Sequence, residues 1–250
     1  MRARHACLVP NPAWATDIIA STMETMEESG IPPQWLPKMT DFQARNASGV
    51  AADVKEYGCG AYGCVYPTHD PKVVLKITGD DTEAQFAAEL APAIERPICV
   101  WYYRVAEPVG AKDNKGSQAY LLWRESADHV GKIEHFFDKQ TGGTSKGDLA
   151  MELIGDQHGA AQAAYNAIAN EWPPDMIHPL IVSWLEACEK MARQTKVPEL
   201  RELGDGLVEV YGAQRIFFGD IHAGNLGMVH REDGDHWVIT DPGHVAVINL

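Results

Sequence analysis

The feature that most restricts the fold of this chain is a set of spaced glycines, Gly58, Gly60 and Gly63, in the pattern G-x-G-x-x-G-x-V that ends at Val65. Because glycine has no Cβ, the backbone N–H groups of such a turn can closely approach phosphate oxygens. The dinucleotide-binding fingerprint has similar spacing, but it requires a helix directly after its last glycine. Here residues 64–67 are strand-like and end at a proline. The pattern therefore favours a strand–turn–strand flap over phosphate.

The spacing of apolar and chain-breaking residues predicts an α+β fold. β-type residues dominate from Val54 to Arg124, interrupted by one helix; helical segments follow, and β-type residues return near the end. We expect strands at 64–67, Val73–Thr78, Ile98–Val105, Ala119–Arg124, Ile216–Phe218, Leu226–His230 and Trp237–Thr240, with a tight turn at 232–235. We expect helices within 12–29 and at Thr82–Ile94, 148–171, 175–195 and 198–211.

Composition and charge limit the classes of partner. The chain has 250 residues, of which 45% are hydrophobic and 22% charged, as in globular rather than disordered proteins. Its 35 acidic and 21 basic side chains give a net charge of −14, which repels nucleic acid. No segment resembles a signal peptide, and no apolar run reaches membrane-spanning length. We therefore expect a cytoplasmic protein without nucleic-acid or membrane partners, in which any phosphate site is built locally.

The cysteines point away from a zinc site. All five are scattered, and only Cys59 and Cys64 are close in sequence. A zinc site would require a second close pair or a histidine-rich segment, and neither follows them. We expect reduced cysteines, as is usual in the cytosol.

Lys76 is notable because it lies within the apolar strand expected at Val73–Thr78. An apolar environment disfavours a charged amine unless an anion is near. The lysine lies either on a polar face of its strand or close enough to reach the α- and β-phosphates of a nucleotide. A carboxylate on the next helix would hold it in place, and Glu83 and Glu89 are both candidates. Glu83 could instead close a capping box with Asp80, and Glu89 could lie on a solvated face.

The strongest signal is the segment Gly219-Asp220-Ile221-His222-Ala223-Gly224-Asn225, between an expected strand and an expected hairpin. Asp220 can orient an attacking hydroxyl and accept its proton, while the amide oxygen of Asn225 can bind Mg²⁺. Asp241, in an Asp-Pro-Gly turn directly after an apolar strand, can supply a second metal contact. By itself such a tripeptide is usually only a turn.

Taken in order, the glycine run, Lys76, a helical glutamate, Asp220 with Asn225, and the Asp241 turn resemble the motifs of the protein-kinase-like superfamily. The loop at 219–225 looks most like that of the aminoglycoside and choline phosphotransferase branch, which carries Gly-Asp-Leu-His-Pro-Gly-Asn. In that branch the lysine partner is often a Glu-Ala at a helix start, which favours Glu83. The resemblance spans roughly residues 54–243 and rests on the joint occurrence of these motifs.

The resemblance implies a two-lobed kinase-like fold with a small antiparallel β N-lobe and a reduced, mainly helical C-lobe. An N-terminal extension with a helix would occupy residues 1–50, the N-lobe residues 51–125 and the C-lobe residues 126–250. The resemblance also implies binding of ATP and Mg²⁺, and transfer of the γ-phosphate to a hydroxyl group of a protein or a small molecule.

Each candidate residue receives a role from the same resemblance. It assigns nucleotide contact to Gly58, Gly60, Gly63, Val65 and the backbone around Trp123–Glu125, and a clamp on the α- and β-phosphates to Lys76 with Glu83. Asp220 is the expected catalytic base, and the expected Mg²⁺ ligands are Asn225 and Asp241. A structural role is expected for His222.

Two features depart from the family pattern. Pro242 occupies a position where an aromatic or aliphatic residue is usual, and the chain ends seven residues after Gly243. Family members normally continue with segments that build the acceptor site. We therefore expect helices within 148–212 or a partner to supply that site, unless it is reduced.

The acceptor is not identified by the sequence, and two other functions stay open. One is a nucleotide-binding pseudokinase or inhibitor that engages a basic partner through its acidic surface. The other is a nucleotidyltransferase that binds ATP in the reversed orientation.

Overall fold

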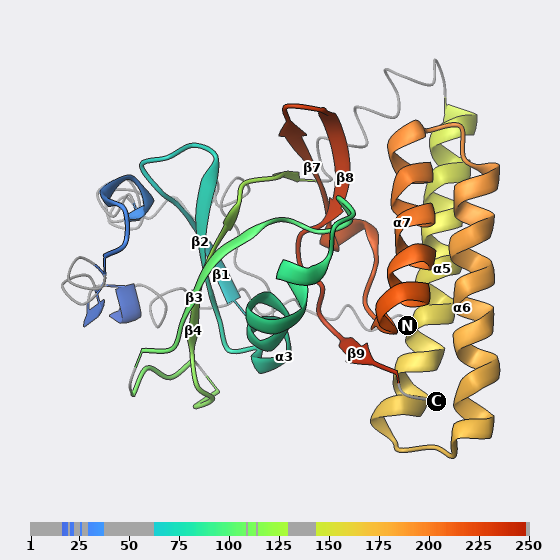
Figure 1. The fold of residues 1–250 in the computed structure, drawn as a ribbon, viewed down its shortest axis with the longest axis horizontal. Coiled ribbons are helices and arrows are strands. Elements are labelled where there is room, and N and C mark those ends of the chain that lie inside the picture. The colour runs from blue at the N-terminus through green and yellow to red at the C-terminus, as the bar shows by residue number, and fades with distance from the viewer. Residues whose placement is uncertain are drawn as a thin grey trace, which may run out of the picture. The chain divides into compact units, whose positions relative to one another are not determined.

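The computed structural model describes residues 17–19, 21–22, 26, 30–37, 63–108, 110–113, 115–129 and 144–248, with residues 144–149 described only as part of a helix. Within these ranges the protein is a mixed α+β structure with small antiparallel sheets and several helices (Figure 1). The chain divides into two compact units, called here the first unit (residues 1–84 and 102–125) and the second unit (residues 85–101 and 126–250).

The first unit contains a four-stranded antiparallel sheet. Its strands, in their order across the sheet, are β1 (Gly63–Pro67), β2 (Val73–Thr78), β4 (Tyr120–Glu125) and β3 (Tyr102–Ala106). β2 has the bounds that the apolar run predicts, and every residue in it is buried. Burial of successive residues requires cover on both faces of the sheet, which is why β2 reads as a continuous apolar run rather than an alternating one.

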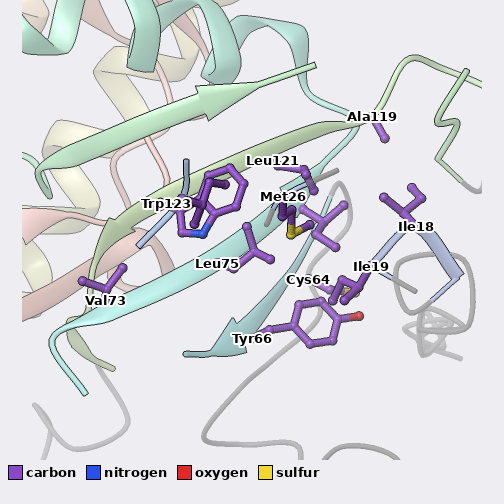
Figure 2. Packing of buried hydrophobic residues seen from close by; sticks show 12 residues of the cluster. Ile18, Ile19, Met26, Cys64, Tyr66, Val73, Leu75, Ala119, Leu121 and Trp123 are labelled. Carbon is purple, nitrogen blue, oxygen red and sulfur yellow. The ribbon is translucent and has the colours of Figure 1, made fainter. Parts of the chain in front are cut away.

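One face of this sheet carries the core of the first unit (Figure 2). Leu75 of β2 and Trp123 of β4 point to this face, and Ile19, from the helix expected within 12–29, packs on it. The Trp123 indole is fully buried, and its Nε1 donates a hydrogen bond to the carbonyl oxygen of Trp35, 3.0 Å away. Because side chains alternate along a strand, Lys76 lies on the opposite face.

A short helical segment follows β2. It begins with α3 (Asp81–Gln85), widens into a π-helical turn (Phe86–Leu90) and ends in a 3₁₀ turn (Ala91–Ala93). The predicted helix at 82–94 is therefore confirmed in position, although its hydrogen-bond pattern changes twice. The π-helical turn places the buried ring of Phe86 edge-on against Phe218, with 5.6 Å between ring centroids.

Residues 85–101 belong to the second unit, whereas the sequence places the boundary at residue 125 alone. The backbone N–H of Ile239 donates to the carbonyl of Ile98 at 2.8 Å, and that of Val100 donates to the carbonyl of Ile239 at 3.2 Å. These bonds occupy the backbone of residues 98–100, so the expected strand at 98–105 begins only at Tyr102. Its predicted start was wrong because a local pattern does not show which segment a backbone pairs with.

Three helices form the larger part of the second unit: α5 (Thr144–Ala169), α6 (Pro174–Gln194) and α7 (Pro198–Gln214) lie side by side (Figure 1). Short connections make consecutive helices antiparallel. α6 and α7 each begin at a proline, which suits the first position of a helix because proline lacks an N–H and an N–H at that position has no partner within the helix. None of the described helices is long and apolar enough to cross a membrane.

Short strands surround the predicted catalytic loop. β6 (Ile216–Phe218) pairs with β9 (Val245–Val247), while β7 (Leu226–Arg231) pairs with β8 (Gly234–Ile239) and with β5 (Asp128–His129). β6 and the β7–β8 hairpin agree with the sequence-based prediction. β5 and β9 were not predicted. The two residues of β5 do not form an apolar or alternating run such as the one that marks β6, and β9 depends on its pairing with β6.

Cys64 differs from the expectation of reduced thiols. It lies in β1 and is disulfide-bonded to a cysteine outside the described residues. Cys99 and Cys188 are free and buried, and burial raises the pKa of the Cys188 thiol. The prediction of reduced cysteines was therefore wrong for Cys64, because spacing along the chain does not show which thiols are paired.

Candidate functional site

Lys76 and Glu83 form a buried ion pair in the first unit. The Lys76 Nζ lies 2.6 Å from Glu83 Oε2, and the two side chains are 5% and 0% exposed. The hydroxyl of Tyr102, in β3, donates a hydrogen bond to Glu83 Oε1 at 3.4 Å. Both carboxylate oxygens therefore have a partner. The interpretation of Lys76 as a lysine on a solvated strand face is excluded.

The start of α3 explains why Glu83 is available for this pair. Asp80 Oδ1 accepts hydrogen bonds from the backbone N–H groups of Thr82, at 2.9 Å, and of Glu83, at 3.3 Å. Asp80 thus caps the helix, and the Glu83 side chain turns to Lys76. Glu89 is exposed and accepts a hydrogen bond from Gln85. The structure therefore pairs Lys76 with Glu83, in agreement with the preference drawn from the Glu-Ala pattern.

Val65 and Leu122 flank Lys76 on the same face of the sheet. In the register of the strands, Lys76 lies directly opposite Val65 of β1 and Leu122 of β4. Opposite residues of antiparallel strands share a face. Leu122 is fully buried and Val65 partly so. The base of the Lys76 side chain therefore lies between two apolar neighbours, and its amine is paired with Glu83.

Gly63 is the part of the glycine run that the structure describes, and Gly58 and Gly60 lie outside the described residues. Gly63 opens β1 opposite Thr78 of β2. A Cβ at this position would lie 2.5 Å from the carbonyl oxygen of Ile77, so a larger residue would push the two strands apart. This glycine is needed for the hairpin itself.

The side chain of Trp123 belongs to the core of the first unit. On β4 it lies between Leu75 of β2 and Arg104 of β3, so its backbone faces neighbouring strands on both sides. Its side chain is fully buried. The indole is therefore not available to a ligand, and contact of the backbone at Trp123–Glu125 with adenine stays a prediction. Glu125 is the last residue of β4 and is also buried, one position beyond the last pair with β3.

Asp220 and Asn225 come together in the second unit. Asp220 follows β6, and Asn225 ends a 3₁₀ turn (Ala223–Asn225) that leads into β7. The Nδ2 of Asn225 donates to the backbone carbonyl of Asp220 at 2.9 Å and to its carboxylate Oδ2 at 3.1 Å. The Asp220 side chain is 27% exposed, so its carboxylate is accessible to an acceptor. A direct hydrogen bond thus joins these two residues, which the sequence expects to act at one reacting centre.

The turn that carries Asp241 packs against the same two residues. Thr240, at the end of β8, donates from its backbone N–H and its hydroxyl to the Asn225 carbonyl, at 2.8 and 3.1 Å. Gly243 has a φ of +52°, a backbone conformation that residues other than glycine rarely adopt. A Cβ on Gly243 would lie 3.0 Å from Asp220 Oδ2. Asp241 therefore lies on a turn that contacts Asn225 on one side and Asp220 on the other.

His222 is bonded within the same loop. Its Nδ1 accepts a hydrogen bond from the backbone N–H of Gly224 at 2.9 Å, which caps the 3₁₀ turn that ends at Asn225. Its Nε2 lies 3.7 Å from Asp220 Oδ1. The structural role expected for His222 agrees with this cap.

Asn225 and Asp241 are the residues that fit Mg²⁺. Since the Asn225 nitrogen points to Asp220, its Oδ1 is directed away from that carboxylate, and amide and carboxylate oxygens are ligands of Mg²⁺. No group of three His, Cys, Asp or Glu side chains in the described ranges could hold a metal ion. Mg²⁺ usually takes only one or two carboxylates from a protein and adds water and phosphate oxygens. Asn225 and Asp241 could therefore supply only part of the coordination of such an ion.

Several residues around these groups carry no signal in the sequence. Tyr102 contacts Glu83, and Thr240 contacts Asn225, across long sequence separations. On α5, His158 and Tyr165 face the loop; their rings contact His222 and His244. These positions belong to no sequence motif. Many residue types of similar shape would fit the same strand or helix pattern, so the pattern does not identify them.

The predicted site residues fall into the two units separately. The first unit holds Lys76, Glu83 and Val65 together, and the second holds Asp220, Asn225 and Asp241 together. That all of them act on one nucleotide stays a prediction. No protein-family model matches the chain, and a search of curated proteins finds no significant similarity.

Proposed function

We propose that this protein is an ATP- and Mg²⁺-dependent phosphotransferase of the protein-kinase-like type, with a small β N-lobe and a reduced helical C-lobe, and that it moves the γ-phosphate to a hydroxyl acceptor. The observation that carries the proposal is the arrangement in the second unit. There a partly exposed Asp220 is hydrogen-bonded to Asn225, and the turn with Asp241 packs on both. A base and two metal ligands are the groups that phosphoryl transfer requires.

In the proposed reaction the acceptor hydroxyl gives its proton to Asp220 as its oxygen forms a bond to the γ-phosphorus. The bond from that phosphorus to the β–γ bridging oxygen breaks, and ADP leaves with the electron pair. The Asn225 N–H group holds one oxygen of the Asp220 carboxylate at 3.1 Å, so the carboxylate is oriented before an acceptor arrives. Positioning of this kind, together with charge stabilisation, supplies most of the rate in phosphoryl transfer.

Asn225 and Asp241 would hold Mg²⁺, which when bound neutralises charge on the phosphates and fixes their orientation. Lys76 would contact the α- and β-phosphates, and Glu83 would keep its amine in place. The burial of this ion pair supports such a role. A buried pair gives little stability compared with apolar residues of the same size, so stability alone does not account for it.

Two parallel incubations test the proposal, one with γ-labelled and one with α-labelled ATP, both with Mg²⁺. The acceptors are water, the protein's own hydroxyl groups and a panel of proteins and small hydroxyl compounds. Label transferred from the γ position alone supports phosphotransfer. Label from the α position would indicate nucleotidyl transfer instead. ATP that raises the Tm without any transfer would indicate a nucleotide-binding pseudokinase, and the proposal would be rejected.

A further inference from the structure

We infer that His222 is a positioning residue for Asp220, acting through both ring nitrogens, and that His158 of α5 fixes the plane of its ring. The inference rests on the proposed function, because it concerns how the proposed base is oriented. It goes beyond a purely structural role for His222 by assigning a separate task to each nitrogen.

The first nitrogen, Nδ1, caps the turn that carries Asn225. It accepts the Gly224 N–H at 2.9 Å, and an acceptor nitrogen in an imidazole has no hydrogen. The turn is only three residues long, Ala223–Asn225, and the Asn225 N–H also donates to the backbone carbonyl of His222 at 2.9 Å. His222 therefore closes the turn from both its side chain and its backbone. The position of the Asn225 amide depends on that closure.

The second nitrogen, Nε2, faces the proposed base. Because Nδ1 is an acceptor, the proton of the neutral ring is on Nε2, which points to Asp220 Oδ1 at 3.7 Å. The other oxygen, Oδ2, accepts the Asn225 N–H at 3.1 Å. The carboxylate is thus hydrogen-bonded through Oδ2, while the His222 Nε2 lies near Oδ1 beyond hydrogen-bond distance and favours this orientation of the carboxylate electrostatically. Catalytic contacts of this length commonly shorten when substrate binds.

α5 supplies the wall against which the His222 ring rests. The rings of His158 and His222 meet edge to face, with centroids 5.3 Å apart and planes at 75°. The His158 Nδ1 is buried and has no hydrogen-bond partner among the described residues. A buried nitrogen without a hydrogen bond lowers the free energy of unfolding. We therefore assign the contribution of His158 to the shape of its ring, which packs against His222.

Gly224 packs closely against the edge of the His222 ring that carries Nδ1 and Cε1. A Cβ at Gly224 would lie 2.7 Å from His222 Cε1 and 3.0 Å from Nδ1. Any larger residue would therefore displace the ring. Two independent contacts, from α5 and from Gly224, leave His222 little freedom to adopt a different orientation.

Two substitutions of His222 separate the tasks of its nitrogens. In His222→Asn the amide oxygen can replace Nδ1 as the cap, but nothing replaces Nε2. We expect kcat to fall about 10- to 100-fold, part of what a general base contributes, with KM for Mg-ATP and Tm unchanged. In His222→Gln the amide nitrogen can reach the position of Nε2, but the cap is lost. We expect a higher KM for Mg-ATP and a lower Tm, with a smaller loss of kcat.

His178, which is exposed on α6, provides the matched control. His178→Asn and His178→Gln should leave kcat, KM and Tm as in the wild type. The inference is overturned if His222→Gln loses as much kcat as His222→Asn, if His222→Asn raises KM and lowers Tm as much as His222→Gln, or if neither variant changes kcat or KM while both remain folded by circular dichroism. For the α5 contact, His158→Phe should keep kcat within about twofold and keep Tm, whereas His158→Ala should lower kcat. An unchanged kcat in His158→Ala would reject the role of α5.

Side-chain ¹⁵N NMR of the wild type gives a readout that does not depend on activity. The His222 signals, assigned by their loss in His222→Asn, should show a proton on Nε2 and none on Nδ1. A proton on Nδ1 would overturn the inference even in an active enzyme. If the tautomer is as expected but no γ-label is transferred, the proposed function fails, and with it the claim that His222 positions a base.

Discussion

The two clusters of polar residues differ in how they are held. Lys76 and Glu83 lie in regular secondary structure and are almost fully buried. Asp220 and His222 lie on a turn and are 27% and 42% exposed in their side chains. A buried ion pair responds to the loss of one partner mainly through stability, because a charge is left without compensation. A partly exposed loop carboxylate can be solvated by water, so its loss should appear mainly in activity. This difference makes the two clusters separable by experiment.

The largest effect is expected in the partly exposed cluster that contains Asp220. Asp220→Ala removes the proposed base, and we expect the rate of γ-label transfer to fall about 10²- to 10⁴-fold while the Tm and ATP affinity stay near the wild-type values. Asp205→Ala, at an exposed position of α7, is the control and should change none of these. Turnover that survives in Asp220→Ala would remove Asp220 from the mechanism.

In the buried cluster, Glu83→Ala leaves Lys76 without its ion-pair partner. We expect a loss of about 3–5 kcal/mol in the free energy of unfolding, measured by urea denaturation. The double variant Lys76→Met with Glu83→Leu should recover most of that stability, because apolar residues of similar volume often replace a buried pair at no cost. It should still be inactive. A Glu83→Ala protein as stable as Asp220→Ala would contradict the contrast between the clusters.

Gly243→Ala tests how closely the Asp241 turn and Asp220 are coupled. The positive φ of Gly243 costs an alanine about 1–2 kcal/mol, and its Cβ would lie 3.0 Å from Asp220 Oδ2. We expect lower stability and a kcat several times lower. Gly110→Ala is the matched control, since Gly110 also has a positive φ (+77°) but no atom within 4 Å of the added Cβ. Gly110→Ala should lose stability only, and an equal loss of kcat in both would argue against the contact.

The smallest expected effect is a pH dependence of the contact between α7 and the β7–β8 hairpin. His236 hydrogen-bonds Glu202 of α7 and Asp233 of the hairpin turn, both at 3.0 Å. Burial by itself lowers the pKa of His236, but these carboxylates raise it, and the net direction is upward from 6.5. A raised pKa in the folded state stabilises the protein below the unfolded value, and the contribution is lost as the pH rises through the folded value.

We therefore expect His236→Gln to lower the Tm more at about pH 5.5 than at about pH 8.5. Glu202 and Asp233 are themselves well exposed, so the effect should be about 1 kcal/mol or less. His178→Gln should show no such difference. A Tm difference that grows with pH would reverse the expected sign.

Much of the fold follows from local pattern. β2, β6 and the β7–β8 hairpin lie where runs of β-type residues predict them, and α6 and α7 start at the expected prolines. The strand expected at 98–105 and the unpredicted β9 show the limit. In both, the outcome depends on a partner far away in the sequence, Ile239 for the first and β6 for the second.

The candidate site shows the same limit. The motif at 219–225 identifies Asp220 and Asn225, but not that Gly243 touches Asp220 or that α5 supports His222. Trp123 shows the reverse case. It lies near the end of the expected strand, and only its pairing on both sides reveals that it belongs to the core.

The sequence alone determined the order of the main strands and helices. It also identified the residues whose side chains can act as a base or bind a metal, because periodicity and motif spacing are local properties of a chain. Only the tertiary structure decided that Glu83 pairs with Lys76, that the nitrogen of Asn225 binds Asp220, and that Cys64 is disulfide-bonded. Each of these depends on the distance between atoms, and that distance is set by the three-dimensional path of the chain, which a pattern of residue types does not specify.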